Sequence, residues 1–593
     1  MARCASPDRK CPNPMKPERF QRELEHLRDI SREFGRRHPA IAPLLLTESA
    51  DPDVERILEG TAFLAAMVAE KIDDQLPEII HTLTQILFPH YLKPLPSVTA
   101  MRLAPRPGLM EPLVIPKGTR FASVPVGDIS CVFSTTSDMS LLPLTLADCS
   151  WREDRETVLR LRFATQGVPM NSWDTDRIRL FLSGEYAPAC ERYRMLTGHV
   201  QQVVLTEHGS QRSLRLPGNA ICPAGFGDDE AILPYSRRSF AGFRLLQEFF
   251  VFPEKYLFLD VAGLAPFLSG ASGKGFDMDI YVDRASFRDT VPFRREHVSL
   301  HVVPAINLFA HGAEPVHVDF TQPEYRIVPA DNAGHAYEIH SIVGVTGLAQ
   351  GGSAERSYRP FEIFANLDDT TPGYTQIFRS DAAGGRLDWY ISFARPGEKN
   401  FEKAFRPETL SVDLLCTNGT VPESLKAGDV RLATANSPVL ADFENITVPT
   451  PYYRPQVDGN ALWHLVSHMY VNYFTLGDRR SLQALLGLYV RNTMRDQGGY
   501  RARLKRIESI EDLSMRNENR LVHGVMMRGS AISLRVDPAG FPCKGDMLLF
   551  GSVLDRFFAS YSGINSYTRL CMEERDSRET LTWPPRLGSR SLL

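Results

Sequence analysis

The chain has 593 residues, of which 43% are hydrophobic, 10% aromatic and 23% charged. At about 150 residues per domain, this length predicts roughly four domains, each large enough to bury a core without a metal or disulfide. The 67 Lys and Arg against 71 Asp and Glu give a net charge of −4, which offers no overall basic surface for nucleic acid. The composition also excludes collagen-like, coiled-coil and wholly disordered proteins.

The nine cysteines are odd in number, widely spaced and without a Cys-x-x-Cys motif. This usage indicates a reducing compartment rather than a disulfide framework or a cysteine zinc site. No stretch reaches the ~18 uninterrupted apolar residues of a membrane-spanning helix. The N-terminus has no apolar run of the kind that a signal peptide carries. We therefore expect a cytoplasmic protein that does not insert directly into a membrane.

Residues 1–17 carry four prolines and are expected to form a disordered leader, with Met1 and Met15 both open as the start of translation. A helix follows from Phe20 and ends before Pro39, because the residue before a proline disfavours the helical conformation. Its apolar residues recur near the helical period of 3.6: Phe20, Leu24, Leu27, Ile30 and Phe34.

A second helix is predicted to open at Asp51, which can cap it, and Pro52, which suits the first helical position. One stripe is expected to face the core: Val54, Ile57, Leu58, Thr61, Leu64, Ala65, Val68 and Ile72. Phe63, Ala66 and Met67 add apolar surface on the other side. A helix that is apolar around most of its girth is buried on more than one face. The second face packs either within its own domain or against a partner chain.

From about residue 97 the hydrophobic period changes to two, which predicts half-buried strands of antiparallel sheets. Apolar residues alternate with polar ones in four clear runs: Leu159–Phe163, Ile178–Leu182, Phe276–Val282 and Leu410–Leu414. Helices return near the C-terminus, through Leu462–Tyr473, Leu482–Tyr489 and Phe550–Tyr561. The fold class is therefore α+β, with a helical N-terminal region, a large antiparallel, sandwich-like middle and an α+β C-terminal part.

These signals suggest a division of the chain into six parts. They are the leader (1–17), a helical bundle region (18–96), a first β-rich domain (97–265), a second β-rich domain (266–455), a C-terminal α+β region (456–575) and a flexible tail (576–593).

Two groups of residues have spacings that metal sites use. His464 and His468 stand four apart on one predicted helix, but a zincin needs a glutamate where this chain has Leu465. Asp277, Asp279 and Asp283 lie on one predicted strand face, without the glycine-containing turn of a calcium loop. We interpret the histidines as structural residues and the aspartates as a solvated sheet face.

Motifs of the common catalytic classes are missing from the sequence. It has no Gly-x-Ser-x-Gly elbow, no Walker lysine and no strand-to-helix dinucleotide motif. We expect no catalytic residue, no metal site and no cofactor, and therefore a protein that is not an enzyme.

Several segments together resemble a known family. Near the N-terminus they are Phe20–Arg28, Pro52–Ala66 and Phe88–Ser97. Further along they are Glu248–Leu264, Val303–Val316, Leu410–Gly419, Trp463–Leu476 and Leu548–Leu570. In this order they resemble the TssF family, baseplate subunits of the bacterial type VI secretion system. The resemblance runs from about Phe20 to Leu570.

The resemblance implies a non-catalytic structural role. Members of the family assemble with TssG, two TssF copies to one TssG, in wedges that also contain TssK and TssE. The wedges surround the VgrG spike hub and support growth of the tube and the contractile sheath. The expected location is the cytoplasmic baseplate docked at the inner membrane.

Within this reading we expect a partner interface on the N-terminal helices, formed by Phe20, Leu24, Leu27, Phe63, Ala66 and Met67. Desolvation of apolar area at about 25 cal/mol per Å² drives such association, less the entropy and polar costs of binding. Two alternatives stay open at this point. One is a β-sandwich binding module of the carbohydrate-recognising or adhesin-like kind, and the other is a metal-dependent hydrolase that uses His464 and His468.

Overall fold

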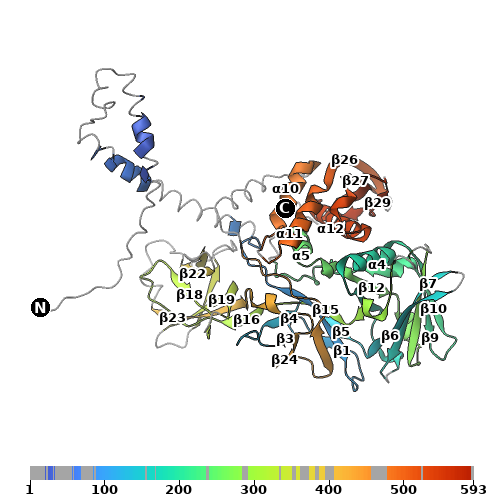
Figure 1. The fold of residues 1–593 in the computed structure, drawn as a ribbon. Coiled ribbons are helices and arrows are strands. Elements are labelled where there is room, and N and C mark those ends of the chain that lie inside the picture. The colour runs from blue at the N-terminus through green and yellow to red at the C-terminus, as the bar shows by residue number, and fades with distance from the viewer. Residues whose placement is uncertain are drawn as a thin grey trace. The chain divides into compact units, whose positions relative to one another are not determined.

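The structure is a computed structural model of the full chain. It describes residues 20–21, 24–30, 33, 56–57, 59–67, 84–85, 89–153, 156–166, 169–235, 240–283, 287, 291–332, 336–349, 355–360, 373–380, 386–393, 407–455, 477–493, 495–522, 525–577 and 579–588. The chain divides into two compact units, one of Met1–Leu87 with Gln456–Val466 and one of Phe88–Pro455 with Ser467–Leu593 (Figure 1).

The described residues of the first unit are helical, at 20–33 and at 56–67 with gaps, and again at 84–85. Helices were expected in the first two places. The expected core stripe of the second helix is wrong, however, because Ile57 is 68% exposed and Leu64 is 63% exposed. Ala62 and Ala66 are fully buried instead. Small alanines allow close helix packing, and a helix with apolar residues on every side gives no signal of which side packs.

The second unit begins with a six-stranded antiparallel sheet that curls on itself. Its order is β24 (Val430–Ala433), β3 (Arg120–Ser123), β4 (Val132–Thr135), β15 (Val302–Ile306), β1 (Val98–Pro105) and β25 (Ala441–Asn445). The two end strands also meet, since the Asn445 side chain accepts the backbone N–H of Val430 at 2.8 Å. The sheet therefore encloses a core of its own, which includes Met101, Phe121 and Phe133. A short pair, β2 (Leu113–Ile115) and β5 (Met139–Leu141), adds Ile115 and Leu141 to this core.

Two further sheets carry the alternating strands that the sequence indicates. One has the order β10 (Ser213–Pro217), β9 (Val200–Glu207), β13 (Gly275–Val282), β7 (Thr157–Thr165) and β6 (Leu144–Glu153). The other has the order β11 (Ile221–Pro223), β12 (Phe258–Ala262), β8 (Arg177–Leu182) and β14 (Val298–Leu300). As predicted, the apolar residues of β7, β8 and β13 are buried, with Leu159, Leu180 and Met278 at most 1% exposed.

Three helices of this region have no counterpart among the predictions. They are α4 (Tyr186–Gly198), α5 (Ala241–Val251) and the short α6 (Ala265–Leu268). Ten of the eleven residues of α5 are buried, so it shows no polar stripe by which a surface helix is recognised. Short 3₁₀ segments occur at Met170–Ser172, Gly218–Ala220, Pro253–Leu257, Arg295–His297, Val421–Ser424 and Pro538–Gly540.

An eight-stranded sheet follows along the chain. Its strands are β16 (Phe309–Gly312), β17 (Val316–Val318), β18 (Tyr325–Ile327), β19 (Glu338–Ala349), β20 (Glu355–Pro360), β21 (Gly373–Ser380), β22 (Leu387–Phe393) and β23 (Glu408–Thr417). All pairs are antiparallel except β20 with β21. The predicted strand through Leu410, Val412 and Leu414 is β23, and these three residues are buried as expected.

The C-terminal part is a mixed α+β layer. The helices are α10 (Arg479–Tyr489), α11 (Gln497–Glu508) and α12 (Lys544–Tyr561), and α12 packs on α4, α5 and β28. The sheet has β26 (Ile510–Val522), β27 (Val525–Val536), β28 (Ser566–Glu574), β29 (Thr580–Thr582) and β30 (Arg586–Leu587). The crossover through α12 makes β27 and β28 parallel, whereas β26 and β27 form a long antiparallel hairpin. The predicted helices α10 and α12 and the α+β class are confirmed.

The sheets and the core cross the expected domain boundaries. Strand β13 pairs with β7 and β9 from the other side of residue 265. One hydrophobic core joins the first β-rich region to the C-terminal part, where the rings of Phe249 and Phe550 lie 5.8 Å apart. Residues 580–587, expected in a flexible tail, form β29 and β30 and pair with β28. Non-local pairing of this kind leaves no trace in local composition.

Two chemical features complete the description. The seven cysteines within the described residues are all free. No helix in the described part of the chain combines the length and the apolar character needed to cross a membrane.

Candidate functional site

The predicted partner interface lies in the first unit, and the structure divides its six residues into three classes. Phe63 and Met67 are exposed, at 46% and 49%. Phe20 and Leu27 are half-buried. Leu24 and Ala66 are buried within the chain itself, at 8% and 0%. Leu24 and Ala66 are therefore shielded from solvent, and Phe63 and Met67 present apolar area to it.

Sequence reasoning missed two residues of the same exposed surface. Ile57 and Leu64 were assigned to the core stripe, yet they are more exposed than Phe63 and Met67. Positions 57 and 64 are seven apart, and 63 and 64 lie four and three positions from 67, so the four side chains cover one side of the helix. In the sequence, the buried side of this helix is indicated only by Ala62 and Ala66, two small residues four positions apart. We call Ile57, Phe63, Leu64 and Met67 the apolar helix face.

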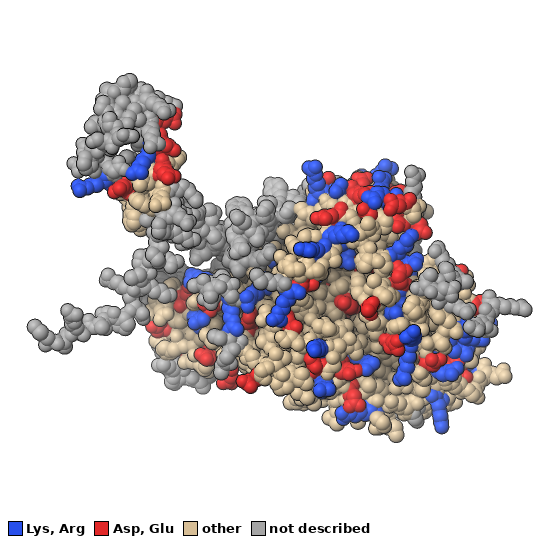
Figure 2. Space-filling model, in the orientation of Figure 1, with Lys and Arg blue, Asp and Glu red and all other residues tan. Residues whose placement is uncertain are grey.

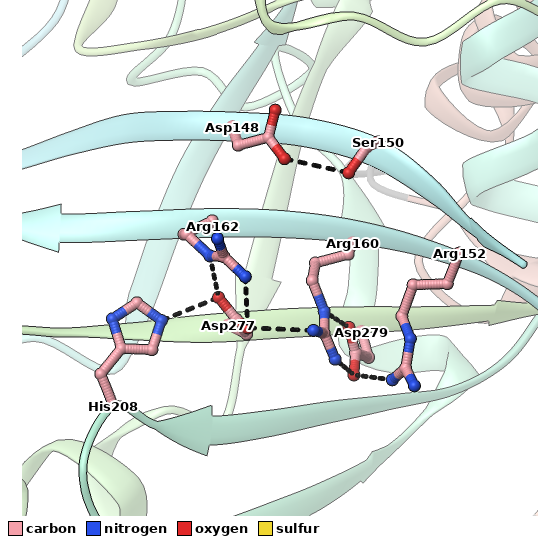
Figure 3. A network of polar contacts seen from close by, with 8 residues as sticks. All are labelled: Asp148, Ser150, Arg152, Arg160, Arg162, His208, Asp277 and Asp279. Atoms are coloured by element: carbon pink, nitrogen blue, oxygen red, sulfur yellow. Dashed lines mark hydrogen bonds and ion pairs between the residues drawn. The ribbon is translucent and has the colours of Figure 1, made fainter.

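The aspartates considered as a cation site are also placed by the structure. Asp277 and Asp279 on β13 lie opposite Arg162 and Arg160 on β7 in the antiparallel register. Arg160 donates two hydrogen bonds to Asp279, each 2.7 Å, in a bidentate pair (Figure 3). Arg162 donates from Nε to Asp277 at 3.0 Å. The two rungs are linked, since Arg160 also lies 3.3 Å from an Asp277 oxygen.

Further groups surround this charged ladder. His208 Nε2 lies 2.8 Å from Asp277, and Arg152 on β6 lies 3.3 Å from Asp279 (Figure 3). Burial raises the pKa of Asp277, but the hydrogen bonds from Arg162 and His208 outweigh it and hold that pKa below its usual value. The Asp277 carboxylate is therefore ionised and paired near neutral pH.

The interpretation of the three aspartates as a solvated sheet face is wrong for two of them, because Asp277 and Asp279 are only 8% and 5% exposed. Asp283 is placed apart from them and pairs with His199 at 3.0 Å. Among the described residues no group of three or more His, Cys, Asp or Glu is arranged to hold a metal ion. The ladder neutralises its own charges and ties two strands together.

A second ladder of the same kind joins β8 to β12. Arg179 makes a bidentate pair with Asp260, with both distances 2.7 Å, and a further ion pair with Glu230 at 2.6 Å. Arg177 reaches the same aspartate at 3.2 Å. A cleft of about 230 Å³ lies beside these residues. Arg177, Arg179 and Glu230 of its lining are engaged in these ion pairs, which leaves them less able to bind a charged ligand.

The interior also holds one deeply buried ion pair. The Lys255 ammonium and the Glu248 carboxylate are each only 1% exposed and are in hydrogen-bond contact. The other oxygen of Glu248 accepts the backbone N–H groups of Ile232 at 2.8 Å and Leu233 at 3.0 Å. Burial lowers the pKa of Lys255, and Glu248 opposes this shift. This pair fixes the loop before α5 against the helix and has the character of a structural element.

The two histidines considered as zinc ligands, His464 and His468, lie outside the described residues, as does the segment Trp463–Leu476. The sequence carries a signal for the partners of Asp277 and Asp279. Arg160 and Arg162 alternate with apolar residues as the aspartates do, so the two strands carry complementary charge patterns.

Comparisons with known proteins agree with this picture. The family model described as "Type VI secretion system, TssF" matches residues 15–590. The chain is 28% identical to the type VI secretion system component TssF1 of Pseudomonas aeruginosa, over 98% of this chain and 99% of that protein.

Two solved structures are similar as well. A chain in the cryo-electron microscopy structure of the type VI secretion system TssK-TssF-TssG baseplate subcomplex superposes with a TM-score of 0.78 at 26% identity, over 91% of this chain and 100% of that chain. A chain in the baseplate complex from the type VI secretion system superposes with a TM-score of 0.61, over 97% and 99% of the two chains. At 24% identity the latter match shows likeness of fold.

Proposed function

Because the chain belongs to the TssF family of the type VI secretion system, we propose that it is a non-catalytic structural subunit of the baseplate that binds TssG through its N-terminal helices. TssF is a baseplate component, and the similar solved chain belongs to a subcomplex with TssK and TssG. The β-sandwich alternative, a carbohydrate-binding or adhesin-like module, is not favoured by a family match across nearly the whole chain.

The observation that carries the proposal is the apolar helix face of Ile57, Phe63, Leu64 and Met67, whose side chains are between 46% and 68% exposed. Four large apolar residues on one side of a helix form a contiguous patch of the kind that marks protein interfaces. Their burial against another helix would supply the drive for association. Half-buried Phe20 and Leu27 extend the proposed interface.

The wider assembly is part of the same proposal. We assign two copies of this chain to one TssG, in a wedge with TssK and TssE that surrounds the VgrG spike hub and supports the sheath. The proposed location is the cytoplasmic side of the inner membrane, where the baseplate docks. Support comes from the relative that is found with TssK and TssG. On the face drawn in Figure 2, acidic and basic side chains are interspersed, which fits protein partners better than nucleic acid.

The non-catalytic part of the proposal has its own test. His464 and His468 lack the glutamate base of a zincin, so we expect purified protein to hold no stoichiometric zinc. The measurement is elemental analysis of protein prepared without chelator. One zinc per chain that is lost from a variant carrying His464→Ala and His468→Ala would overturn it.

The interface is tested by co-expression with TssG of the same organism. Tagged wild-type chain should co-purify TssG in a 2:1 complex by native mass spectrometry. Phe63→Asp and Met67→Asp should each abolish co-purification, because an exposed apolar contact would have to bury an unpaired carboxylate. The thermal transition of the isolated variants should stay at the wild-type temperature, since both side chains are exposed in the unit itself.

Two matched variants separate binding from folding. Gln21→Glu adds the same charge at an exposed position of the same unit and should leave TssG binding intact. Ala66→Asp places a carboxylate at a fully buried position and should lower the melting temperature. Retention of TssG by the Phe63 and Met67 variants would contradict the assignment of the interface.

A further inference from the structure

Two cysteines that are 353 positions apart in sequence meet where α4 contacts the start of α12. Cys190 lies on α4 and is fully buried, and Cys543 is the N-cap residue of α12 and is half-buried. The Cys543 thiol donates to the carbonyl of Ala187 at 3.4 Å, one helical turn before Cys190 on α4. The approach is close because Gly545, two residues after Cys543, lies directly against the carbonyl group of Cys190.

The surroundings give the two sulfur atoms different chemistry. Cys543 Sγ accepts the backbone N–H of Asp546 at 3.4 Å, at the positive end of an 18-residue helix. The neighbouring Cys190 thiol lowers the pKa of Cys543, burial opposes this, and the N–H of Asp546 lowers the pKa further. Burial raises the pKa of Cys190 well above its usual value. Cys543 is therefore the thiolate-forming partner, and Cys190 is a thiol held beside it.

The acidic groups near the pair are themselves engaged. Asp546 accepts a hydrogen bond from Tyr186 at 2.6 Å and pairs with Arg506 at 2.6 Å. Glu191 accepts the backbone N–H of Gly545 at 2.8 Å. The charges of Glu191 and Asp546 still raise the pKa of Cys543, but each contributes less than the lowering by Cys190 and by the N–H of Asp546.

From this geometry we propose that Cys190 and Cys543 form an oxidation site, at which a peroxide converts the two thiols to one disulfide between α4 and α12. The Cys543 thiolate attacks a peroxide oxygen, the O–O bond breaks, and a sulfenic acid and hydroxide form. Cys190 then attacks the Cys543 sulfur, the S–S bond forms, and the S–OH oxygen leaves as water with the Cys190 proton. Two thiols and one hydrogen peroxide give one disulfide and two waters.

The other cysteines within the described residues are less suited to this reaction. Burial raises the pKa of Cys131 to about 11 and those of Cys149 and Cys416 to about 12, which suppresses the thiolate. Burial also raises the pKa of Cys571. Cys222 is exposed, and its thiol donates to the carbonyl of Asn219 at 3.1 Å. Oxidation of Cys222 therefore shows only that peroxide has reached an exposed thiol, and this cysteine serves as the internal control for the treatment.

The test treats full-length reduced protein with hydrogen peroxide and maps all nine cysteines by peptide mass spectrometry under non-reducing conditions. We expect a peptide containing Cys190 joined to one containing Cys543, reversed by dithiothreitol. The melting temperature should rise in the oxidised protein, because the cross-link closes a long loop of the unfolded chain. Cys190→Ser should remove the linked peptide and leave a sulfenic acid on Cys543 that dimedone traps.

The opposite result is equally definite. If Cys190 and Cys543 both remain open to alkylation after Cys222 has been oxidised, the pair is not an oxidation site. A Cys543 sulfenic acid in wild type that never links to Cys190 would also overturn the proposal. Mapping of the wild-type chain needs no substitution, so the test stands even where the serine variants fold poorly.

Discussion

Tyr567 lies directly against Gly529 across the parallel pair of β27 and β28, and its ring fills the space where a side chain at position 529 would stand. The Tyr567 hydroxyl donates to Glu518 at 3.1 Å, and Glu518 also pairs with Arg569 at 2.8 Å. Three neighbouring strands are thus tied together over one glycine. An aromatic ring over a strand glycine replaces the packing that the glycine lacks.

The first prediction concerns this contact. Gly529→Ala should lower the free energy of unfolding by about 1–3 kcal/mol, because the added methyl group displaces the Tyr567 ring. Urea denaturation followed by circular dichroism measures the change. Gly487→Ala is the matched control, since that glycine lies in α10 with free space around it and should gain up to about 1 kcal/mol. Equal effects of the two substitutions would show that the ring does not constrain position 529.

The charged ladder of β7 and β13 gives a second prediction. Asp279→Ala leaves the Arg160 and Arg152 guanidinium groups without their shared carboxylate and should cost about 1.5–3 kcal/mol of stability. Glu444→Ala serves as the comparison, because it breaks an ion pair at the surface: the Arg102 side chain is 45% exposed and that of Glu444 is 43% exposed. That change should cost at most about 1 kcal/mol. The order of the two losses in urea denaturation is the test, and a reversed order would refute the ladder's structural role.

The third prediction is a pH dependence at Asp277. Its pKa is lower in the folded chain than in the unfolded chain, so the carboxylate contributes stability above the unfolded pKa of about 3.9. The contribution is lost as pH falls through the folded pKa. The stability difference between wild type and Asp277→Asn should therefore shrink below about pH 4. A difference that grows as pH falls below 4 would contradict the assigned direction.

The fourth prediction concerns the buried pair of Lys255 and Glu248. Lys255→Met removes the cation and leaves a buried carboxylate, which should cost about 3–5 kcal/mol. The double variant Lys255→Met with Glu248→Gln should recover part of this loss, because the glutamine oxygen can still accept the N–H groups of Ile232 and Leu233. A double-mutant cycle measures the coupling. Additive losses would mean that the two groups do not interact.

Strands were predictable from the sequence wherever one face of a sheet is buried. In β7, β8, β13 and β23 the alternation of apolar and polar residues matches the observed burial, because the side-chain period of a strand is two. Helix α5 was not predictable in this way, since it is buried on every side. Helix α4 carries Arg192 and Tyr193 inside the core beside Cys190, and this mixture shows no clean apolar stripe.

The candidate sites show a similar division. The sequence indicates that the helix of residues 56–67 has too much apolar surface to bury on one face, and in the structure Phe63 and Met67 are exposed. It cannot indicate that Ile57 and Leu64 share the exposed side, because that depends on which neighbour packs against Ala62 and Ala66. The charge of Asp279 is compensated by Arg160, 119 residues earlier, and only the pairing of β13 with β7 brings them together.

The curled six-stranded sheet constrains how the protein is made in the cell. Its strand β1 receives its last neighbour, β25, only after some 342 further residues, as the contact of Arg102 with Glu444 shows. At a synthesis rate of about 5–20 residues per second, this interval lasts roughly 20 to 70 s. During that time the apolar side of β1 has left the ribosome, but the six-stranded sheet that buries it is still incomplete. High contact order of this kind slows folding and favours aggregation of nascent chains. Fragments that end before residue 445 should therefore accumulate in inclusion bodies, and chaperone supply should limit the yield of the complete chain.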